Sequence, residues 1–140
     1  ALKGIEILQS GKADIAHGSR KLKESVIHRP QPWFRRVISR IMRLIFIYGL
    51  RIPKLSDTQC GFKIYPGEIA KSLYASSRCD GFLFDIEIIA LAQKMGYQIA
   101  EFPIEWTADL DSRLSPIKSF KNIFKELIGI QKTLKMIRKN

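Results

Sequence analysis

Hydrophobic residues recur along the chain at two spacings, and each spacing predicts a different kind of element. A short apolar run at 13–17 and an alternating run at 100–106 predict β-strands. Apolar positions three and four residues apart predict helices at 1–10, at 33–48, from Pro66 onward, before Gly96 and at 119–139. The polar segment 21–32, which contains two prolines, is expected to be a loop. Helices that alternate with strands in this way predict an α/β fold.

The helix predicted over 33–48 separates apolar from basic positions. At 100° per residue, an apolar stripe runs along one side: Trp33, Val37, Ile41, Leu44 and Tyr48. The arginines of this segment lie in the opposite arc, together with Ser39. Because residues 44–48 are apolar all round, two interpretations stay open: a helix buried in the core, and a helix that lies at a membrane surface.

The helix predicted over 119–139 is amphipathic and basic as well. Its apolar residues are expected to face inward: Phe120, Ile123, Phe124, Leu127, Ile130, Leu134 and Ile137. Residues 33–50 and 119–139 together predict a protein held peripherally at the cytoplasmic face of a membrane, since one weak anchor rarely suffices. Serine at Phe46 and Ile47 is expected to weaken such binding.

Charge is distributed unevenly over the 140 residues, whose formal net charge is +11. Between Arg20 and Lys54 there are ten Lys and Arg against one acidic residue, and after Ser115 there are seven against one. The segment between them carries more acidic than basic residues. Basic segments favour partners that carry phosphate, which include nucleic acid, lipid and small ligands.

Two short segments carry the most evident chemistry. Asp57 precedes a turn that contains Gln59 and Gly61, and a short strand follows. A carboxylate in this position either faces a ligand at the rim of a sheet or bonds its own backbone. The turn Gly18-Ser19-Arg20 offers a phosphate backbone N–H groups, a hydroxyl and a guanidinium.

The other ionisable residues are less distinctive. Asp85 and Glu87 begin a helix, where the macrodipole favours carboxylates, and their spacing puts them on different faces. The isolated His17 and His28 are expected to be structural or solvated. The two cysteines are expected to be reduced thiols, and the lack of a Cys or His cluster argues against zinc.

Six motifs, taken in order, resemble glycosyltransferase family 2. Within that family they are most similar to the polyprenyl-phosphate sugar synthases, especially the dolichyl-phosphate β-glucosyltransferase branch. The motifs are Gly18-Ser19-Arg20, Arg35-x-x-x-Ser39, Asp57-x-Gln59-Cys60-Gly61-Phe62-Lys63, Phe84-Asp85-x-Glu87, Glu101-x-Pro103-x-x-Trp106 and Asp111-Ser112-Arg113-Leu114. The resemblance covers only the second half of such an enzyme, so the sequence is expected to be a fragment.

The resemblance implies the acceptor-side, C-terminal part of a GT-A catalytic domain over 1–115, with 116–140 as its basic C-terminal helix. It implies inverting transfer of a sugar, glucose in this branch, from a nucleotide sugar to a polyprenyl phosphate. It also implies Mg²⁺ or Mn²⁺ held by an Asp-x-Asp motif in the other half, with no metal ligand in this sequence. The 140 residues alone are therefore expected to be inactive.

The resemblance also assigns roles to single residues. Asp57 matches the catalytic base, and Gln59, Gly61, Asp85 and Glu87 match positions near the sugar or the acceptor. The positions that match phosphate-binding residues are Arg20, Arg35, Ser39 and Arg113. A phosphate monoester is already largely ionised at neutral pH. We therefore expect Asp57 to orient the acceptor or to stabilise charge on the sugar ring, with proton abstraction secondary.

Two other classes of function remain open on the sequence. A nucleic-acid-binding module would account for the clustered basic charge, although zinc-finger spacing and RNA-binding aromatic signatures are missing and no nucleic-acid partner is expected. A membrane-surface scaffold without catalysis would account for the basic amphipathic helices. Neither class accounts for the segment around Asp57.

Overall fold

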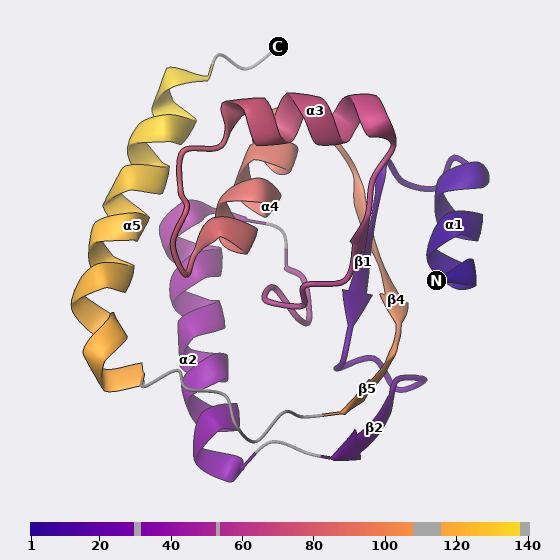
Figure 1. Cartoon of the computed structure of the whole chain (residues 1–140), viewed down its shortest axis with the longest axis horizontal. Helices are drawn as coiled ribbons and strands as arrows, with labels where there is room; N and C mark the ends of the chain where they lie inside the picture. Colours follow the sequence, from indigo (N-terminus) through magenta and orange to yellow (C-terminus); the bar gives the residue numbers. More distant parts are fainter. Residues whose placement is uncertain (30–31, 53, 108–115, 138–140) are drawn as a thin grey trace.

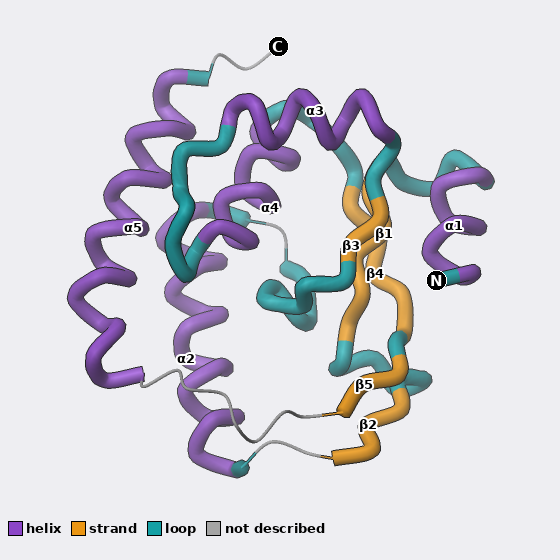
Figure 2. Tube along the Cα trace, in the orientation of Figure 1, coloured by secondary structure: helices purple, strands orange, loops and turns teal. Residues whose placement is uncertain are grey.

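The computed structural model describes residues 1–29, 32–52, 54–107 and 116–137, and it has an α/β architecture, as the pattern predicted (Figure 1). Its elements are, in order, α1 (Leu2–Gln9), β1 (Ile15–Ser19), β2 (Val26–Arg29), α2 (Trp33–Leu50), β3 (Lys63–Ile64), α3 (Gly67–Ser76), α4 (Phe84–Lys94), β4 (Ile99–Pro103), β5 (Glu105–Thr107) and α5 (Pro116–Met136). Helix α1 lies on one side of the strands, and the other helices lie on the opposite side (Figure 2).

Strand β1 is the centre of a three-stranded sheet with the order β3-β1-β4. It runs parallel to β4, with Ile15 opposite Ile99, and antiparallel to β3. All of its residues are buried, including the polar side chains of His17 and Ser19. Gly18 is required there, since a Cβ atom at this position would lie 2.9 Å from the carbonyl oxygen of Phe62. The segment that leads into β3 therefore packs directly on the end of β1.

Two buried clusters hold the helices in place. Ile15 of β1 packs with Leu73 of α3 and with residues of α4. The larger cluster joins α2, α4 and α5 and includes Met42, Phe46, Leu50, Ile86, Ile89, Ile123, Leu127 and Ile130. None of the described helices combines the length and the apolar character that crossing a membrane requires.

The two long helices are present as expected, and each carries apolar residues on both its buried and its exposed side. On α2 the core face is formed by Met42, Phe46 and Leu50, whereas Trp33 and Tyr48 are each 75% exposed. The helix is apolar nearly all round at its C-terminal end, so periodicity alone does not identify the core face. On α5 the expected inward set was partly wrong, because Phe124 is exposed whereas Ile123, Leu127 and Ile130 are buried.

The strands differ from the sequence prediction at two places. The segment predicted as a polar loop contains β2, which pairs in parallel with β5 in a separate two-stranded sheet. The single strand predicted over 100–106 is two strands, because Ile104 separates β4 from β5 and each pairs with a different partner. Pro103, which has no N–H to donate, ends β4, and β4 is an edge of the three-stranded sheet.

Candidate functional site

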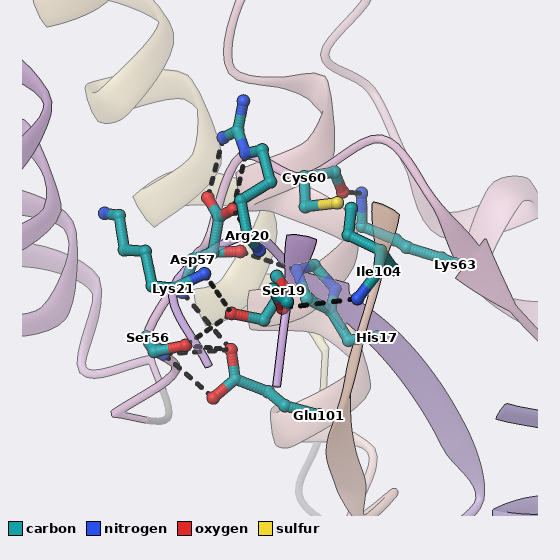
Figure 3. Close-up of polar contacts among 11 residues, drawn as sticks. His17, Ser19, Arg20, Lys21, Ser56, Asp57, Cys60, Lys63, Glu101 and Ile104 are labelled. Carbon is teal, nitrogen blue, oxygen red and sulfur yellow. Dashed lines mark hydrogen bonds and ion pairs between the residues drawn. The ribbon is translucent and has the colours of Figure 1, made fainter. Parts of the chain in front are cut away.

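The carboxylate of Asp57 is buried and forms a two-bond ion pair with Arg20. Its side chain is 2% exposed and lies in the loop between α2 and β3, beside the C-terminal end of β1. The Nε and Nη2 atoms of Arg20 donate to Oδ2 and Oδ1 at 2.6 and 2.8 Å (Figure 3). The backbone N–H of Arg20 also donates to Oδ2, at 3.1 Å. Both carboxylate oxygens are thus occupied by one residue.

The backbone of Asp57 is held from two further sides. Its N–H donates to the carboxylate of Glu101 at 3.2 Å, and its carbonyl oxygen accepts a hydrogen bond of 2.7 Å from Nε2 of His17. A carbonyl oxygen carries no proton, so the proton of the neutral His17 ring resides on Nε2. Glu101 also accepts bonds from the backbone N–H and the hydroxyl of Ser56, at 3.0 and 2.8 Å. The loop around Asp57 is therefore fixed by residues from β1 and β4.

The ionisation of these groups follows from burial and pairing. Burial favours a higher pKa for Asp57, but the hydrogen bonds and the charge of Arg20 outweigh it, and the pKa is lowered. The bonds to Asp57 raise the pKa of Arg20 in turn. Burial lowers the pKa of His17, which keeps its ring neutral. A carboxylate with a lowered pKa and two occupied oxygens is a poor proton acceptor at neutral pH.

A basic pocket of about 580 Å³ lies next to this ion pair. Five cationic side chains line it: Arg20, Lys21, Arg36, Arg40 and Arg43. Ser39, Ser56, Ile27 and Trp106 complete the lining among the described residues, and none of these is acidic. The guanidinium carbon of Arg20 lies 4.9 Å from the centre of the Trp106 ring, which is cation–π distance. Such a pocket has the composition expected of a site for a phosphate-bearing ligand.

The structure brings together only part of the expected phosphate-binding set. Arg20 and Ser39 both line the pocket, whereas Arg35 is not among its lining residues. Arg113 lies outside the described residues. Helix α2 supplies Arg36, Arg40 and Arg43 instead, one or two turns apart on the arc next to Ser39.

Glu101, Lys21 and Trp106 were not predicted as site residues. The basic arc of α2 was visible in the sequence, and it is the signal that identifies the arginines of the pocket. No local signal in the sequence pairs Glu101 with Ser56, which lies 45 residues earlier in the chain. Such a pairing depends on the register between β1 and β4.

The residues expected near the sugar or acceptor lie in different surroundings. Asp85 pairs with Nζ of Lys63 at 2.6 Å, and this amine also donates to the carbonyl oxygen of Cys60 at 2.7 Å. The start of α4 is thereby tied to the segment that follows Asp57. In that segment Gln59 is half-buried, and Gly61 is exposed with no described atom within 4 Å of the position its Cβ would take.

Glu87 is buried and holds the connection between α3 and α4. Its Oε2 atom accepts hydrogen bonds from the hydroxyl of Ser77 and from the backbone N–H groups of Arg78 and Cys79, at 2.6 to 2.9 Å. Asp85 and Glu87 thus bind different segments, as their spacing predicted. Among the described residues no group of three or more His, Cys, Asp or Glu side chains could hold a metal ion.

Comparisons with known proteins agree with the motifs. The chain is 32% identical over 133 residues to dolichyl-phosphate β-glucosyltransferase from Homo sapiens. The aligned region covers 92% of this chain and 40% of that protein. For the enzyme of the same name from Mus musculus the identity is 31% over 138 residues, covering 91% and 42%. The enzyme of this name from Dictyostelium discoideum is 36% identical over 87 residues, which are 62% of this chain and 27% of that protein.

The chain spans less than half the length of these three relatives. No family model matches it, and no solved structure matches it either. The resemblance inferred from the six motifs is nevertheless confirmed by the curated relatives. Over the part that it shares with them, the chain is similar to the dolichyl-phosphate β-glucosyltransferases, which are family 2 glycosyltransferases.

Proposed function

We propose that these residues form the acceptor-side part of a GT-A glycosyltransferase that transfers glucose from a nucleotide sugar to a polyprenyl phosphate, such as dolichyl phosphate, with inversion. In this reaction a phosphate oxygen of the acceptor attacks the anomeric carbon of the sugar. The bond from that carbon to the donor diphosphate breaks, and the nucleoside diphosphate leaves with the electron pair. The donor-binding residues belong to the part of the enzyme outside the matched region.

The observation that carries this proposal is the basic pocket beside Asp57. Acceptor phosphate and donor diphosphate bring like charges together, so the reaction needs fixed cations at the point where they meet. The pocket supplies five of them and no acidic lining residue. Mg²⁺ or Mn²⁺ would neutralise the leaving diphosphate when bound, but the described residues form no cluster that fits such an ion. We place its ligands elsewhere in the enzyme.

The exposed side of α2 supports a lipid acceptor at a membrane surface. Its exposed apolar residues form a continuous stripe: Trp33, Phe34, Val37, Ile41, Leu44, Ile45 and Tyr48. The arc with Ser39 and the pocket arginines adjoins this stripe on the same helix. One helix thus presents cations to a phosphate head group and an apolar surface to acyl or prenyl chains. We propose that α2 lies peripherally on the cytoplasmic face of the membrane.

We propose that Asp57 contributes through electrostatics and orientation, not by removing a proton. Its pKa is lowered by the pairing with Arg20, and the acceptor phosphate needs little deprotonation at neutral pH. In the complete enzyme, Asp57→Asn is expected to lower kcat for sugar transfer substantially. Near-normal turnover of this variant would contradict a role for the carboxylate.

The test of the proposed function is transfer from UDP-glucose to dolichyl phosphate by the complete enzyme. Arg40→Gln is expected to raise KM for the polyprenyl phosphate about tenfold, because it removes one charged contact to phosphate. Arg51→Gln is the matched control, since Arg51 is an exposed arginine at the end of the same helix and is not among the pocket residues. No acceptor-dependent transfer, or equal effects of the two substitutions, would overturn the proposal.

A further inference from the structure

Two acidic residues lie beside a pocket built for anions, and charge alone does not explain their presence. Asp57 and Glu101 each add a negative charge close to the five pocket cations. By Coulomb's law both should weaken the binding of phosphate. Their hydrogen bonds suggest a compensating role.

We infer that Asp57 and Glu101 are positioning residues for Arg20, which binds a phosphate group in the pocket. Glu101 fixes the segment Ser56–Asp57, Asp57 fixes the guanidinium of Arg20, and Arg20 presents its other N–H groups to the phosphate. The inference rests on the proposed function for the reaction in which that phosphate takes part. Neither acidic residue needs to touch the substrate.

The geometry of Arg20 is the first support for this inference. A guanidinium has N–H donors on all three nitrogens, and Asp57 engages Nε and Nη2. In Figure 3 the third nitrogen points away from Asp57. Trp106 covers one face of the same group, and Arg20 lines the pocket. The side chain is thus held by one edge and one face, while its other edge is available to an anion.

The bonds of Glu101 are the second support. Its carboxylate accepts from Ser56 N–H, Ser56 Oγ and Asp57 N–H, which are consecutive donors of the loop that carries Asp57. The hydroxyl of Ser56 also lies 2.6 Å from that of Ser19, the residue before Arg20. Glu101 therefore sets the position of the loop relative to the end of β1, from which Arg20 extends.

Binding of an anion orders the side chains that contact it, at a cost in conformational entropy. A free arginine side chain has several rotatable bonds and loses rotamer entropy on binding. An arginine already held by a carboxylate has lost most of it before the anion arrives, which favours binding. The inference therefore predicts that removing a negative charge here weakens anion binding, although electrostatics alone predicts the opposite.

The experiment titrates inorganic phosphate into the 140-residue chain and follows the arginine Nε–Hε signals by NMR. Asp57→Asn and Glu101→Gln are each expected to raise the Kd at least threefold and to broaden or shift the Arg20 signal in the absence of phosphate. Glu105→Gln is the matched control, because its carboxylate is exposed and pairs with His28. The Glu105→Gln variant is expected to have an unchanged or slightly lower Kd for phosphate.

A double variant separates positioning from general damage to the fold. Arg20→Lys keeps the charge but cannot form the two-bond pair, so it should also weaken phosphate binding. Adding Asp57→Asn to Arg20→Lys should cause little further loss, because both act through the same contact. Should Asp57→Asn fail to fold, Ser56→Ala gives the test, since it removes one Glu101 bond and keeps both backbone donors. It is expected to raise Kd about twofold.

Tighter phosphate binding in Asp57→Asn or Glu101→Gln, unchanged Kd in folded Ser56→Ala, or additive losses in the double variant would overturn the inference. Farnesyl phosphate and UDP, titrated in the same way, identify the source of the phosphate as acceptor or donor. If neither responds to Arg20→Lys, the inference also fails. Sugar transfer is not needed for any of these readouts, so loss of the proposed function and loss of this inference are observed separately.

Discussion

The carboxylate of Asp57 and the guanidinium of Arg20 meet edge to edge, at 2.6 and 2.8 Å, although 37 residues separate them in the chain. The pair joins the end of β1 to the loop before β3, and its arginine lines the basic pocket. Stability, ionisation and ligand binding are therefore linked at one contact.

We expect Asp57→Asn to lower the free energy of unfolding by about 2 to 3 kcal/mol. Breaking a fully buried ion pair costs about 3 to 5 kcal/mol, and the effect is smaller here because the Arg20 side chain keeps 22% exposure. Urea unfolding, monitored by circular dichroism, measures this change in the free energy of unfolding. The control is Glu68→Gln, which breaks the exposed pair with Lys71 and should change stability by less than about 0.5 kcal/mol. Equal effects of the two substitutions would contradict this account.

We expect the chain to lose stability as the pH falls below 6.5, in part because of His17. Burial lowers the pKa of this ring, so the unfolded chain takes up a proton that the folded chain does not. The stability that the neutral ring contributes is present above pH 6.5 and is lost as pH falls through its lowered pKa. Unfolding free energies between pH 8 and 5 measure this slope.

Substitution of His17 tests how much this residue contributes to the pH dependence of the free energy of unfolding. His17→Gln should flatten the slope between pH 6.5 and 5, because this variant has no imidazole at the buried position. A slope unchanged by His17→Gln would assign the pH dependence to other groups.

We expect Val37→Ser combined with Ile41→Ser to reduce binding to anionic vesicles at least tenfold. Both side chains are about half exposed on α2, at 48% and 53%, and each is worth at least about 1 kcal/mol when it enters a lipid surface. Flotation with phosphatidylserine vesicles at low salt measures the change.

The pair chosen from the sequence, Phe46 and Ile47, does not test membrane binding. Phe46 is 0% exposed in the core, so serine there would unfold the helix. Lys132→Ser on the exposed side of α5 is the mild control. Failure of the unmodified chain to float at low salt, or equal flotation of the Val37/Ile41 variant, would exclude α2 as the lipid-binding surface.

We expect the 140 residues alone to bind UDP-glucose weakly or not at all in the presence of Mg²⁺ or Mn²⁺. The carboxylates that could be considered as metal ligands already have partners, since Asp57 pairs with Arg20 and Asp85 with Lys63. No metal-binding cluster exists among the described residues. Isothermal calorimetry decides the point, and tight metal-dependent binding would show that the donor site lies within this chain.

Local patterns were sufficient for much of the architecture. The period of apolar residues located α2 and α5, and Gly96 ends α4 with φ +87°, a conformation that glycine adopts without strain. The motif order also located Asp57, Arg20 and Ser39, which the structure places at or beside one pocket. These features depend on residues close together in sequence, where spacing and residue type carry the information.

Tertiary structure alone decided which faces are buried and which distant groups meet. Strand β2 is only four residues long and exists through pairing with β5, nearly 80 residues later. The stripe of α2 is exposed because α4 and α5 cover the side that carries Phe46. Glu101 reaches Ser56 because β4 lies beside β1. Each of these three outcomes follows from long-range packing and strand register, and none of them is encoded in a local period.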